Sequence, residues 1–294
     1  MFFKPRLAVI YVEYSPDKYK GAFAKVKSYL GDSLRGRTVY VIVNNRDEGN
    51  GSRIIDEGTY YIQGNNLERE FSGWQRGLEF LREQKIQFDV VLFVNEAFEA
   101  VQPSYLGSNN AGWITLKTYL LKSAFGAIDT LWEKTKIHGK STRAWINTNC
   151  FFMPVSLLEK LGSLVSIDNG EMDTYIPKEF PGPLELFTDS SPVNPVYREH
   201  LISWLTEEWH GKFVLDERTW PIFRAKTKAI LNEAVLSIRI RELGHFILPY
   251  SVPTFVFLKT RGLFRRIRKV IFGRTEESCR EETLEGGERH KGIA

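Results

Sequence analysis

A run of five apolar residues, Val90 to Val94, constrains the fold of this 294-residue chain more than any other feature. The run is too short for a lone helix and rich in β-branched valine, so it predicts a strand buried on both faces of a sheet. Asn95 and Glu96 follow it directly. In an open α/β sheet, polar residues just past the carboxyl end of a central strand face the ligand crevice, which makes both residues candidates for a binding site. The alternative is that they only solvate a strand end, and the two interpretations stay open at this point.

Apolar runs and amphipathic segments alternate along the first hundred residues. Strands are predicted at Leu7–Val12, Thr38–Val43 and Tyr60–Ile62, and helices at Lys20–Leu30 and Glu70–Gln84. Together with the 90–94 strand, this alternation indicates an α/β fold with a largely parallel sheet flanked by helices. The second helix carries Gly73 and Gly77 on one side, at a cost of roughly 1 kcal/mol each against alanine. That cost indicates a close approach at this face, either by a strand or by a bound ligand.

Composition restricts the class of protein. The chain is 43% hydrophobic and 26% charged with a formal charge of +4, which is typical of one large globular domain. Two cysteines, Cys150 and Cys279, lie far apart without metal-type or redox-type spacing, so the sequence predicts a reducing, cytoplasmic location and no disulfide framework. No leader-like apolar segment opens the sequence, and no run reaches the roughly 18 to 20 apolar residues of a membrane span.

The sequence changes character after Tyr250. Residues 259–274 contain no acidic side chain, and Leu263, Phe264, Ile267, Val270 and Ile271 repeat at helical spacing beside a basic flank. Such a stripe predicts a helix that lies on an anionic bilayer surface, and the apolar residues favour lipid over nucleic acid as the partner. The last residues are rich in glutamate and predict disorder. The predicted organisation is a globular domain over 1–250, a basic amphipathic membrane-surface segment over 251–274 and an acidic tail over 275–294.

The order of the elements resembles the family-two glycosyltransferases of the GT-A fold. The second strand closes in a polar loop, Asn44 to Ser52, and the segment Ser72–Leu78 (SGWQRGL) opens the helix before the 90–94 strand. Downstream, Ala144–Gly162 is similar to the strand and helix that this family places beside its acceptor. The most specific match lies in Ile230–Tyr250, where Leu-Ser-x-Arg-x-x-x-Leu-Gly follows Asn232-Glu233 at the position of the family's Glu-Asp pair.

The resemblance implies a GT-A (nucleotide-diphospho-sugar transferase) fold, with a C-terminal amphipathic basic helix added here. It implies an enzyme that moves a sugar from a nucleotide-sugar donor to a glycan or lipid-linked acceptor in polysaccharide or glycolipid assembly, peripheral at the inner face of the membrane. An inverting transferase needs a carboxylate to deprotonate the acceptor hydroxyl, and the resemblance gives this role to Glu233. The competing interpretation makes Glu233 a charge at a helix start, favoured there by the helix dipole.

The resemblance also implies two sets of binding residues. The donor set is Glu13, Asn44, Gly73, Arg76, Asn95 and Glu96. The acceptor set is Asn147, Asn149 and Trp204. Tryptophans at helical spacing more often belong to a core, so packing is the alternative role for Trp204.

Two departures from the family pattern concern the metal cofactor and the contact with the base of the nucleotide. Family members end the fourth strand in Asp-x-Asp, which holds a divalent cation, Mg²⁺ or Mn²⁺, whereas this chain has Asn95-Glu96-Ala97. Glu96 is then the one candidate metal ligand, and the metal requirement stays open. A metal-free version needs cationic side chains on the leaving diphosphate, for which Arg76, Lys140, Arg143 and Lys226 are the candidates. Asn44 replaces the aspartate that contacts the base of the nucleotide.

Two other classes of protein compete with a glycosyltransferase. A catalytically inactive binding or scaffold protein would keep the fold after losing the Asp-x-Asp pair. A sugar nucleotidyltransferase would need a glycine-rich phosphate loop after the first strand, where this chain has Tyr14-Ser15-Pro16.

Overall fold

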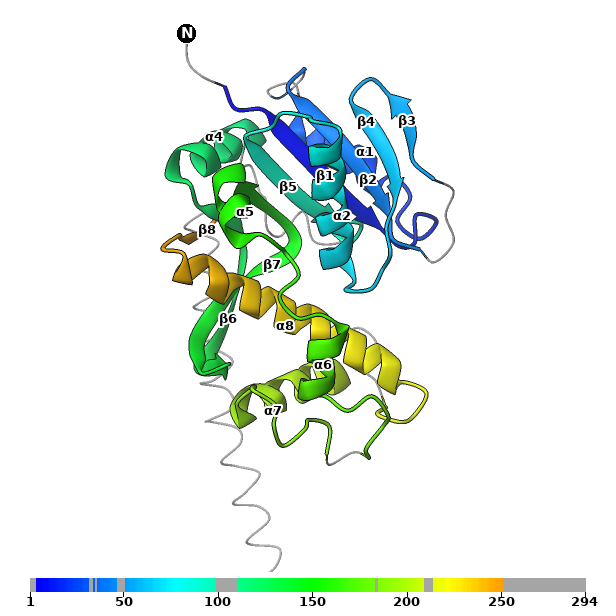
Figure 1. Ribbon diagram of the computed structural model, residues 1–294, viewed down its shortest axis with the longest axis vertical. Coiled ribbons are helices and arrows are strands. Elements are labelled where there is room, and N and C mark those ends of the chain that lie inside the picture. Colours follow the sequence, from blue (N-terminus) through cyan, green and yellow to red (C-terminus); the bar gives the residue numbers. More distant parts are fainter. Residues whose placement is uncertain are drawn as a thin grey trace, which may run out of the picture. The chain divides into compact units, whose positions relative to one another are not determined.

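The computed structural model describes residues 4–31, 34, 36–46, 51–98, 110–182, 185–208 and 214–250. Within these residues, eight strands form one sheet in the order β3-β4-β2-β1-β5-β7-β6-β8 (Figure 1). The strands are β1 (Leu7–Glu13), β2 (Thr38–Asn44), β3 (Arg53–Asp56), β4 (Thr59–Gln63), β5 (Val90–Asn95), β6 (Ala124–Ile137), β7 (Lys140–Pro154) and β8 (Ile247–Pro249). The helices are α1 (Ala22–Leu30), α2 (Glu70–Glu83), α4 (Ala111–Leu121), α5 (Val155–Leu161), α6 (Asn169–Tyr175), α7 (Pro195–Ser203), the π-helical η2 (Trp204–Glu208) and α8 (Trp220–Glu242).

The centre of the sheet is parallel, as the alternation of strands and helices predicts. Strand β1 pairs in parallel with β2 and β5, and β2 pairs in parallel with β4. Every residue of β5 is buried, which confirms the prediction of a central strand covered on both faces. The sheet continues with the long antiparallel strands β7 and β6, beyond which β8 pairs in parallel with β6. The mixed α/β class is therefore confirmed, whereas the finer GT-A assignment stays a prediction.

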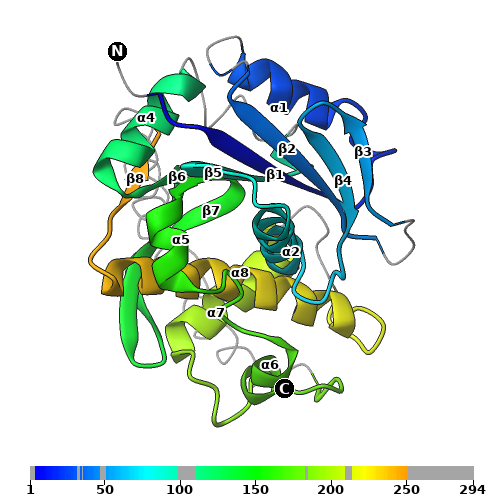
Figure 2. The same ribbon diagram turned by 45° about the horizontal axis from the view of Figure 1, so that its top comes forward.

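Helices cover both faces of the sheet (Figure 2). One face carries α2, α5 and α8, which supply Trp74, Leu158 and Leu236 to a common core. The opposite face carries α1 and α4, which pack Val26 and Ile114 against it. A third cluster fills the space under the far ends of β6 and β7, where α6, α7, η2 and the first turns of α8 gather. Helix α8 therefore links the sheet core to this additional helical layer.

The paired glycines of α2 face a strand. A Cβ on Gly77 would lie 2.4 Å from Ile10 Cγ2, and one on Gly73 would lie 2.9 Å from Val12 Cγ2. Since Ile10 and Val12 belong to the buried strand β1, the close approach comes from the sheet. Of the two alternatives drawn from the sequence, the strand is confirmed. Gly73 therefore packs on β1, and its role as a donor contact has no support from this geometry.

Several predictions fall outside the described residues. The basic segment 251–274 and the acidic tail 275–294 lie there, as does Cys279, so the domain boundary after residue 250 stays a prediction. Cys150 is a free, buried thiol. Within the described part of the chain, no helix combines the length and the apolar character needed to cross a bilayer.

Candidate functional site

Three predicted donor residues lie at one edge of the sheet. In the parallel register Glu13 is opposite Asn44, and Asn95 is opposite Val12, so the carboxyl ends of β1, β2 and β5 meet there. The hydroxyl of Tyr61 donates to Glu13 Oε1 at 3.0 Å. Burial raises the pKa of Glu13, and the Tyr61 hydrogen bond opposes this shift. Asn44 is buried and donates from Nδ2 to Gln63 Oε1 at 3.2 Å. Three of the predicted donor residues therefore lie close together, and their contact with a donor stays a prediction.

The carboxylate of Glu96 organises the loop that follows β1. Its Oε2 accepts hydrogen bonds from the backbone N–H groups of Tyr14 at 2.9 Å and Ser15 at 2.7 Å, and the residue is buried. A metal site needs further ligands, and among the residues that the structure describes no group of three His, Cys, Asp or Glu side chains can hold an ion. Among the described residues, Glu96 therefore has no neighbouring set of acidic, histidine or cysteine side chains with which to share an ion.

Variants of Glu96 distinguish a role in holding the loop after β1 from a role as a metal ligand. We expect Glu96→Ala to lower the free energy of unfolding by about 2–4 kcal/mol and to weaken donor binding, because two buried N–H groups lose a charged acceptor. Glu96→Gln keeps an oxygen acceptor and should lose less than half as much in both measurements. Urea unfolding and donor hydrolysis provide the two readouts. Equal loss of donor use in both variants, together with strong dependence on Mn²⁺, would assign Glu96 to a metal instead.

A polar network joins the edge of β2 to the start of α2. The amide of Asn45, which is fully buried, donates from Nδ2 to Arg69 O at 2.8 Å and to the Tyr14 hydroxyl at 3.2 Å. That hydroxyl in turn donates to Glu70 Oε2 at 3.4 Å. The Arg69 guanidinium lies 5.5 Å from the centre of the Tyr14 ring. The sequence prediction did not single out these residues, although Asn45 belongs to the polar loop that it emphasised.

Glu233 projects from the middle of α8 toward the strand β7. The helix begins at Trp220, more than three turns earlier, so the interpretation of Glu233 as a helix-start charge is wrong. Its Oε1 accepts from the hydroxyl of Thr148 and from the Thr148 N–H at 3.2 Å. Burial raises the pKa of this carboxyl to about 8, helped by nearby Asp129 and opposed by the Thr148 hydrogen bonds. A carboxyl that titrates near neutral pH suits proton transfer.

A bulge in β7 carries two of the predicted acceptor residues, Asn147 and Asn149, on either side of Thr148, which binds Glu233. Ile128 pairs with Ile146 while Gly126 pairs with Phe151, so the four residues from Asn147 to Cys150 lie opposite Ala127 alone. Bulges of this kind re-aim side chains, and they are common beside active sites. We call these four residues the β7 bulge.

Residues of the β7 bulge form hydrogen bonds with two carboxylates, Asp129 of β6 and Glu233 of α8. Asn147 donates from Nδ2 to Asp129 Oδ2 at 2.9 Å, while its own Oδ1 accepts from the Asn149 N–H at 2.9 Å. The next residue, Thr148, holds Glu233. Asp129 was not predicted. The available signal was a lone acidic residue inside the otherwise apolar start of β6.

Tyr197 of α7 faces the same carboxylates. The side chain is fully buried, and its hydroxyl has no hydrogen-bond partner among the described residues. Burial raises the pKa of this phenol well above its ordinary value, and the charges of Glu233 and Asp129 act in the same direction. An unpartnered buried hydroxyl is costly, so it marks a position where a ligand or a water can bind.

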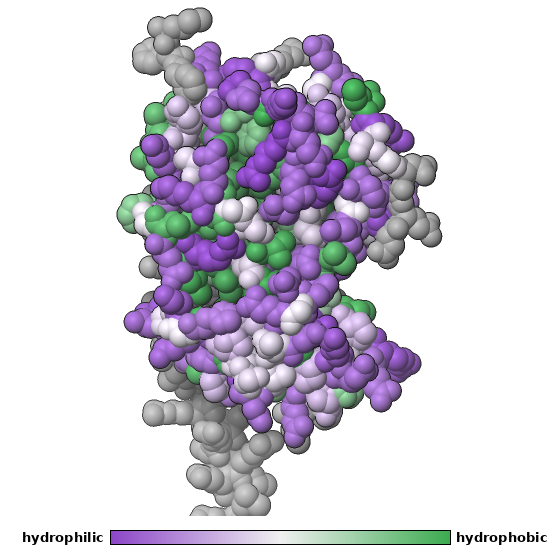
Figure 3. Space-filling model, in the orientation of Figure 1, coloured by the Kyte–Doolittle hydropathy of each residue, from purple (hydrophilic) through white to green (hydrophobic). Residues whose placement is uncertain are grey.

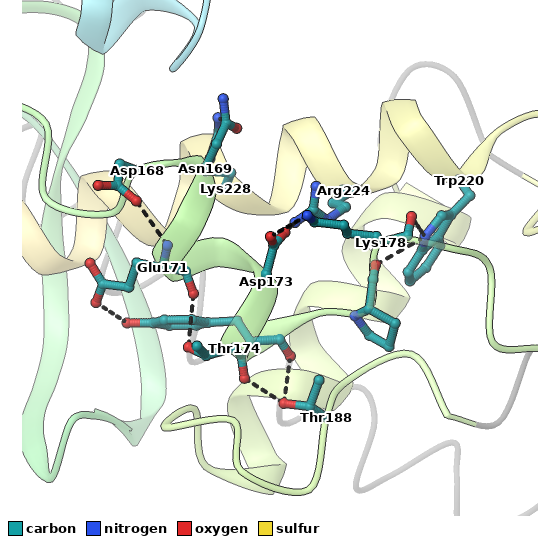
Figure 4. Close-up of polar contacts among 12 residues, drawn as sticks. Asp168, Asn169, Glu171, Asp173, Thr174, Lys178, Thr188, Trp220, Arg224 and Lys228 are labelled. Carbon is teal, nitrogen blue, oxygen red and sulfur yellow. Dashed lines mark hydrogen bonds and ion pairs between the residues drawn. The ribbon is translucent and has the colours of Figure 1, made fainter.

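Other polar side chains of α8, on a different face from Glu233, anchor the surrounding loops. Figure 4 shows Arg224 and Lys228 among them. Arg224 forms an ion pair with Asp173 of α6, and Lys228 donates to the carbonyl of Leu67 at 2.6 Å. Asn232 is fully buried and accepts the N–H groups of Ser166 and Ile167. These three α8 residues recur every four positions and share one face. They therefore fix α6 and the loop before α2 against the helix that carries Glu233.

Two predicted site residues, Arg76 and Trp204, do not join the cluster of Glu233, Asp129 and Tyr197. Arg76 pairs with Glu83 at 2.9 Å along α2, whose outward surface is hydrophilic (Figure 3). Trp204 is half-buried and packs against the third hydrophobic cluster, in agreement with the packing alternative. Among the candidate cations, Lys140 is exposed and pairs with Glu242 at 2.6 Å, and Arg143 is exposed. Lys226 alone of the four lies close enough to interact electrostatically with Glu70 and Glu233.

Comparisons with known proteins add a distant structural similarity. No protein-family model matches the chain, and no curated protein matches it. A similar solved structure is the mannosyltransferase PcManGT from Pyrobaculum calidifontis in complex with GDP-Man and Mn²⁺. The two chains share 13% identity, the match covers 89% of this chain and 81% of the other, and the TM-score is 0.34. At that level of similarity no residue role transfers to this chain.

Proposed function

We propose that this chain transfers a sugar from a nucleotide-sugar donor to a hydroxyl group of a glycan or lipid-linked acceptor. The observation that carries the proposal is the placement of Glu233. Its half-buried carboxyl is held by Thr148, faces Asp129 and Tyr197, and has a pKa of about 8. A general base is most effective when its pKa lies near the working pH.

The proposed reaction inverts the anomeric centre. The acceptor oxygen attacks the anomeric carbon while its proton passes to the Glu233 carboxylate, and the bond from that carbon to the diphosphate oxygen breaks. Thr148 orients Glu233 through two hydrogen bonds. Asn147 orients Asp129 through a hydrogen bond to its Oδ2. The nucleoside diphosphate leaves with the electron pair of the broken bond.

A donor panel tests this function. The full chain is incubated with UDP-, GDP- and dTDP-sugars, with Mn²⁺ or with EDTA, and release of the nucleoside diphosphate is measured. We expect hydrolysis of one donor class and its loss in Glu233→Gln. Binding of a donor without any turnover would favour the inactive scaffold, which the missing Asp-x-Asp motivates. Release of pyrophosphate from a nucleoside triphosphate would favour the nucleotidyltransferase, although Glu96 fixes Tyr14 and Ser15 where that enzyme needs a glycine-rich loop.

The proposal includes a place of action, the cytoplasmic surface of the membrane. It rests on the sequence of residues 259–274, whose basic flank and apolar stripe suit an anionic bilayer. A lipid-linked acceptor is confined to that surface, so docking there would bring donor and acceptor together.

Truncation after Tyr250 tests this location. We expect the truncated chain to lose sedimentation with vesicles that contain phosphatidylserine, while hydrolysis of a soluble donor stays within about threefold of the full chain. Salt should weaken docking of the full chain, since the Debye length is about 10 Å at 0.1 M. A chain with Leu263 and Ile267 intact but the flanking arginines replaced by glutamine should dock weakly. Equal vesicle binding by the truncated and full chains would contradict the proposal.

A further inference from the structure

The helix α4 is apolar on the side that faces solvent as well as on the side that faces the sheet. Trp113, Leu120 and Leu121 are each more than half exposed. Ile114 and Thr118 lie on the other side of the helix and are buried. A surface helix of a globular protein ordinarily turns charged and polar residues outward. The outer side of α4 is therefore unusual, and it carries three large apolar side chains.

The turn between α8 and β8 extends this apolar surface. Phe246, just before β8, is more than half exposed, and its carbonyl accepts from the Ala124 N–H at 3.1 Å. The neighbouring His245 donates from Nδ1 to the carbonyl of Lys122, the residue that ends α4, at 2.7 Å. These bonds hold the turn against the end of α4, and both views of the fold show α4 and β8 together at one edge (Figures 1 and 2). We call the four exposed residues the α4 patch: Trp113, Leu120, Leu121 and Phe246.

The side chains that accompany the α4 patch are basic. Residues 110–128 and 243–250, the two segments that carry it, contain no Asp or Glu. The ammonium of Lys117 lies 5.1 Å from the centre of the Trp113 ring, and Lys122 is exposed. Two copies of the chain that met through this patch would bring these like charges together, whereas an anionic lipid surface attracts them. Tryptophan and lysine also suit a bilayer interface, because each has an apolar body and a polar end.

We propose that the α4 patch inserts into the surface of an anionic bilayer. The inference rests on the place of action given under the proposed function, and it deepens that part by naming a surface of the globular domain that meets the lipid. The described chain ends at Tyr250, shortly after Phe246, and the basic segment 259–274 follows. A small apolar face alone holds a protein on a bilayer weakly, whereas two contacts in one chain reinforce each other. The chain truncated after Tyr250 keeps the patch and is therefore still expected to lose sedimentation.

Sedimentation with vesicles of phosphatidylcholine and phosphatidylserine tests the patch in the full chain. We expect the double variant Trp113→Gln with Leu120→Gln to weaken partitioning by about tenfold or more, because two apolar side chains no longer enter the lipid. Both side chains are exposed, so the unfolding temperature should stay close to that of the parent. The matched control is Ile54→Gln. Ile54 is an exposed residue of β3, at the opposite edge of the sheet from β8, and its loss should change partitioning by less than about twofold.

A fluorescent label reports contact with lipid directly. An environment-sensitive fluorophore is attached to Leu120→Cys in a chain with Cys279→Ser, where the remaining Cys150 is buried. We expect its emission to shift to the blue when phosphatidylserine vesicles are added, since the label leaves water. The same label on Ile54→Cys should not shift.

The outcomes separate the α4 patch from the proposed function. Partitioning of the double variant equal to that of the parent, or a label at position 120 that does not shift on vesicles, overturns the patch and leaves residues 259–274 as the anchor. A blue shift that grows with protein concentration without vesicles overturns it in favour of a second copy of the chain. Absence of vesicle binding by the full chain overturns both the patch and the place of action. Vesicle binding through the patch without turnover of any donor supports the patch and removes the proposed sugar transfer.

Discussion

Replacement of Glu233 by glutamine is expected to reduce turnover by about 100-fold or more while leaving donor affinity within about threefold. Glutamine keeps the size of the side chain and can still accept from Thr148, but it cannot take a proton from the acceptor. In the parent chain, the base must be deprotonated, so kcat/KM should rise with pH, reach half of its plateau near pH 8 and level off above that value. Turnover of the glutamine variant close to that of the parent would remove Glu233 from this role.

The same substitution should also change stability in a pH-dependent way. The folded-state pKa of Glu233 is raised from 4.5 to about 8, so the unfolded chain releases this proton first as the pH rises. The contribution of Glu233 to stability is therefore present below about pH 4.5 and is lost as the pH approaches 8. A neutral glutamine has no such loss, so Glu233→Gln should be stabilised relative to the parent at pH 8 by on the order of 4 kcal/mol, and by less than about 1 kcal/mol at pH 5.

A control on the same helix separates this effect from a general change of charge. Glu242 is in the last turn of α8 and is paired on the surface with Lys140. Glu242→Gln should change turnover by less than twofold and stability by less than about 1 kcal/mol at either pH. Urea unfolding at pH 5 and pH 8 measures both variants. A stability difference for Glu233→Gln that does not vary with pH would contradict the burial of its carboxyl in this network.

Gly77→Val is expected to destabilise the fold by about 3 kcal/mol or more. The new Cβ would lie 2.4 Å from Ile10 Cγ2, and the surrounding core is closed because Ile10 is fully buried in β1. Either α2 moves away from the sheet or Ile10 leaves its preferred rotamer, and overpacking of this kind typically costs 1–3 kcal/mol before the added γ-carbons are counted. The shift of α2 would also displace Glu70 and the loop before it.

Valine on the outer surface of the same helix provides the comparison. Glu79 is half exposed, so Glu79→Val tests the helix propensity of valine without a clash and should cost less than about 1 kcal/mol. Free energies of unfolding from urea titration compare the two variants. If Gly77→Val were no less stable than Glu79→Val, the contact between α2 and β1 would be looser than the structure shows.

Elements with a strong pattern were predictable from the sequence. The predicted strand at 90–94 became Val90–Asn95, and the predicted helix at Glu70–Gln84 became Glu70–Glu83. Apolar runs and amphipathic faces depend only on residues close together in the sequence, so the sequence alone is sufficient to predict these strands and helices. Strand β3 was missed because all four of its residues are exposed and have no buried face to mark them. The helical spacing around Trp204 is confirmed, but α7 changes there into the π-helical η2, a change that the spacing does not encode.

The residues of the candidate site likewise fall into those that a local pattern predicts and those that depend on long-range contacts. Glu233 was predicted from a local segment, and the strand-end residues from the rule for parallel sheets. Asp129, Tyr197 and Arg69 were not predicted, because each enters the site through a long-range contact. Asp129 arrives through the pairing of β6 with β7, and Tyr197 through the packing of α7 under that hairpin. Periodicity describes one element at a time, so it carries no information about which elements cross.

The β7 bulge also affects which insertions and deletions the fold can accept in evolution. Its residues lie opposite a single residue of β6, so the register on either side is set by Ile128 with Ile146 and by Gly126 with Phe151. An added or deleted residue within the bulge would leave both of those pairings, and the buried sheet that they belong to, in place. Short insertions at Asn147–Asn149 can therefore alter the surroundings of Asp129 and Glu233 while the parallel strands of the sheet are inherited unchanged.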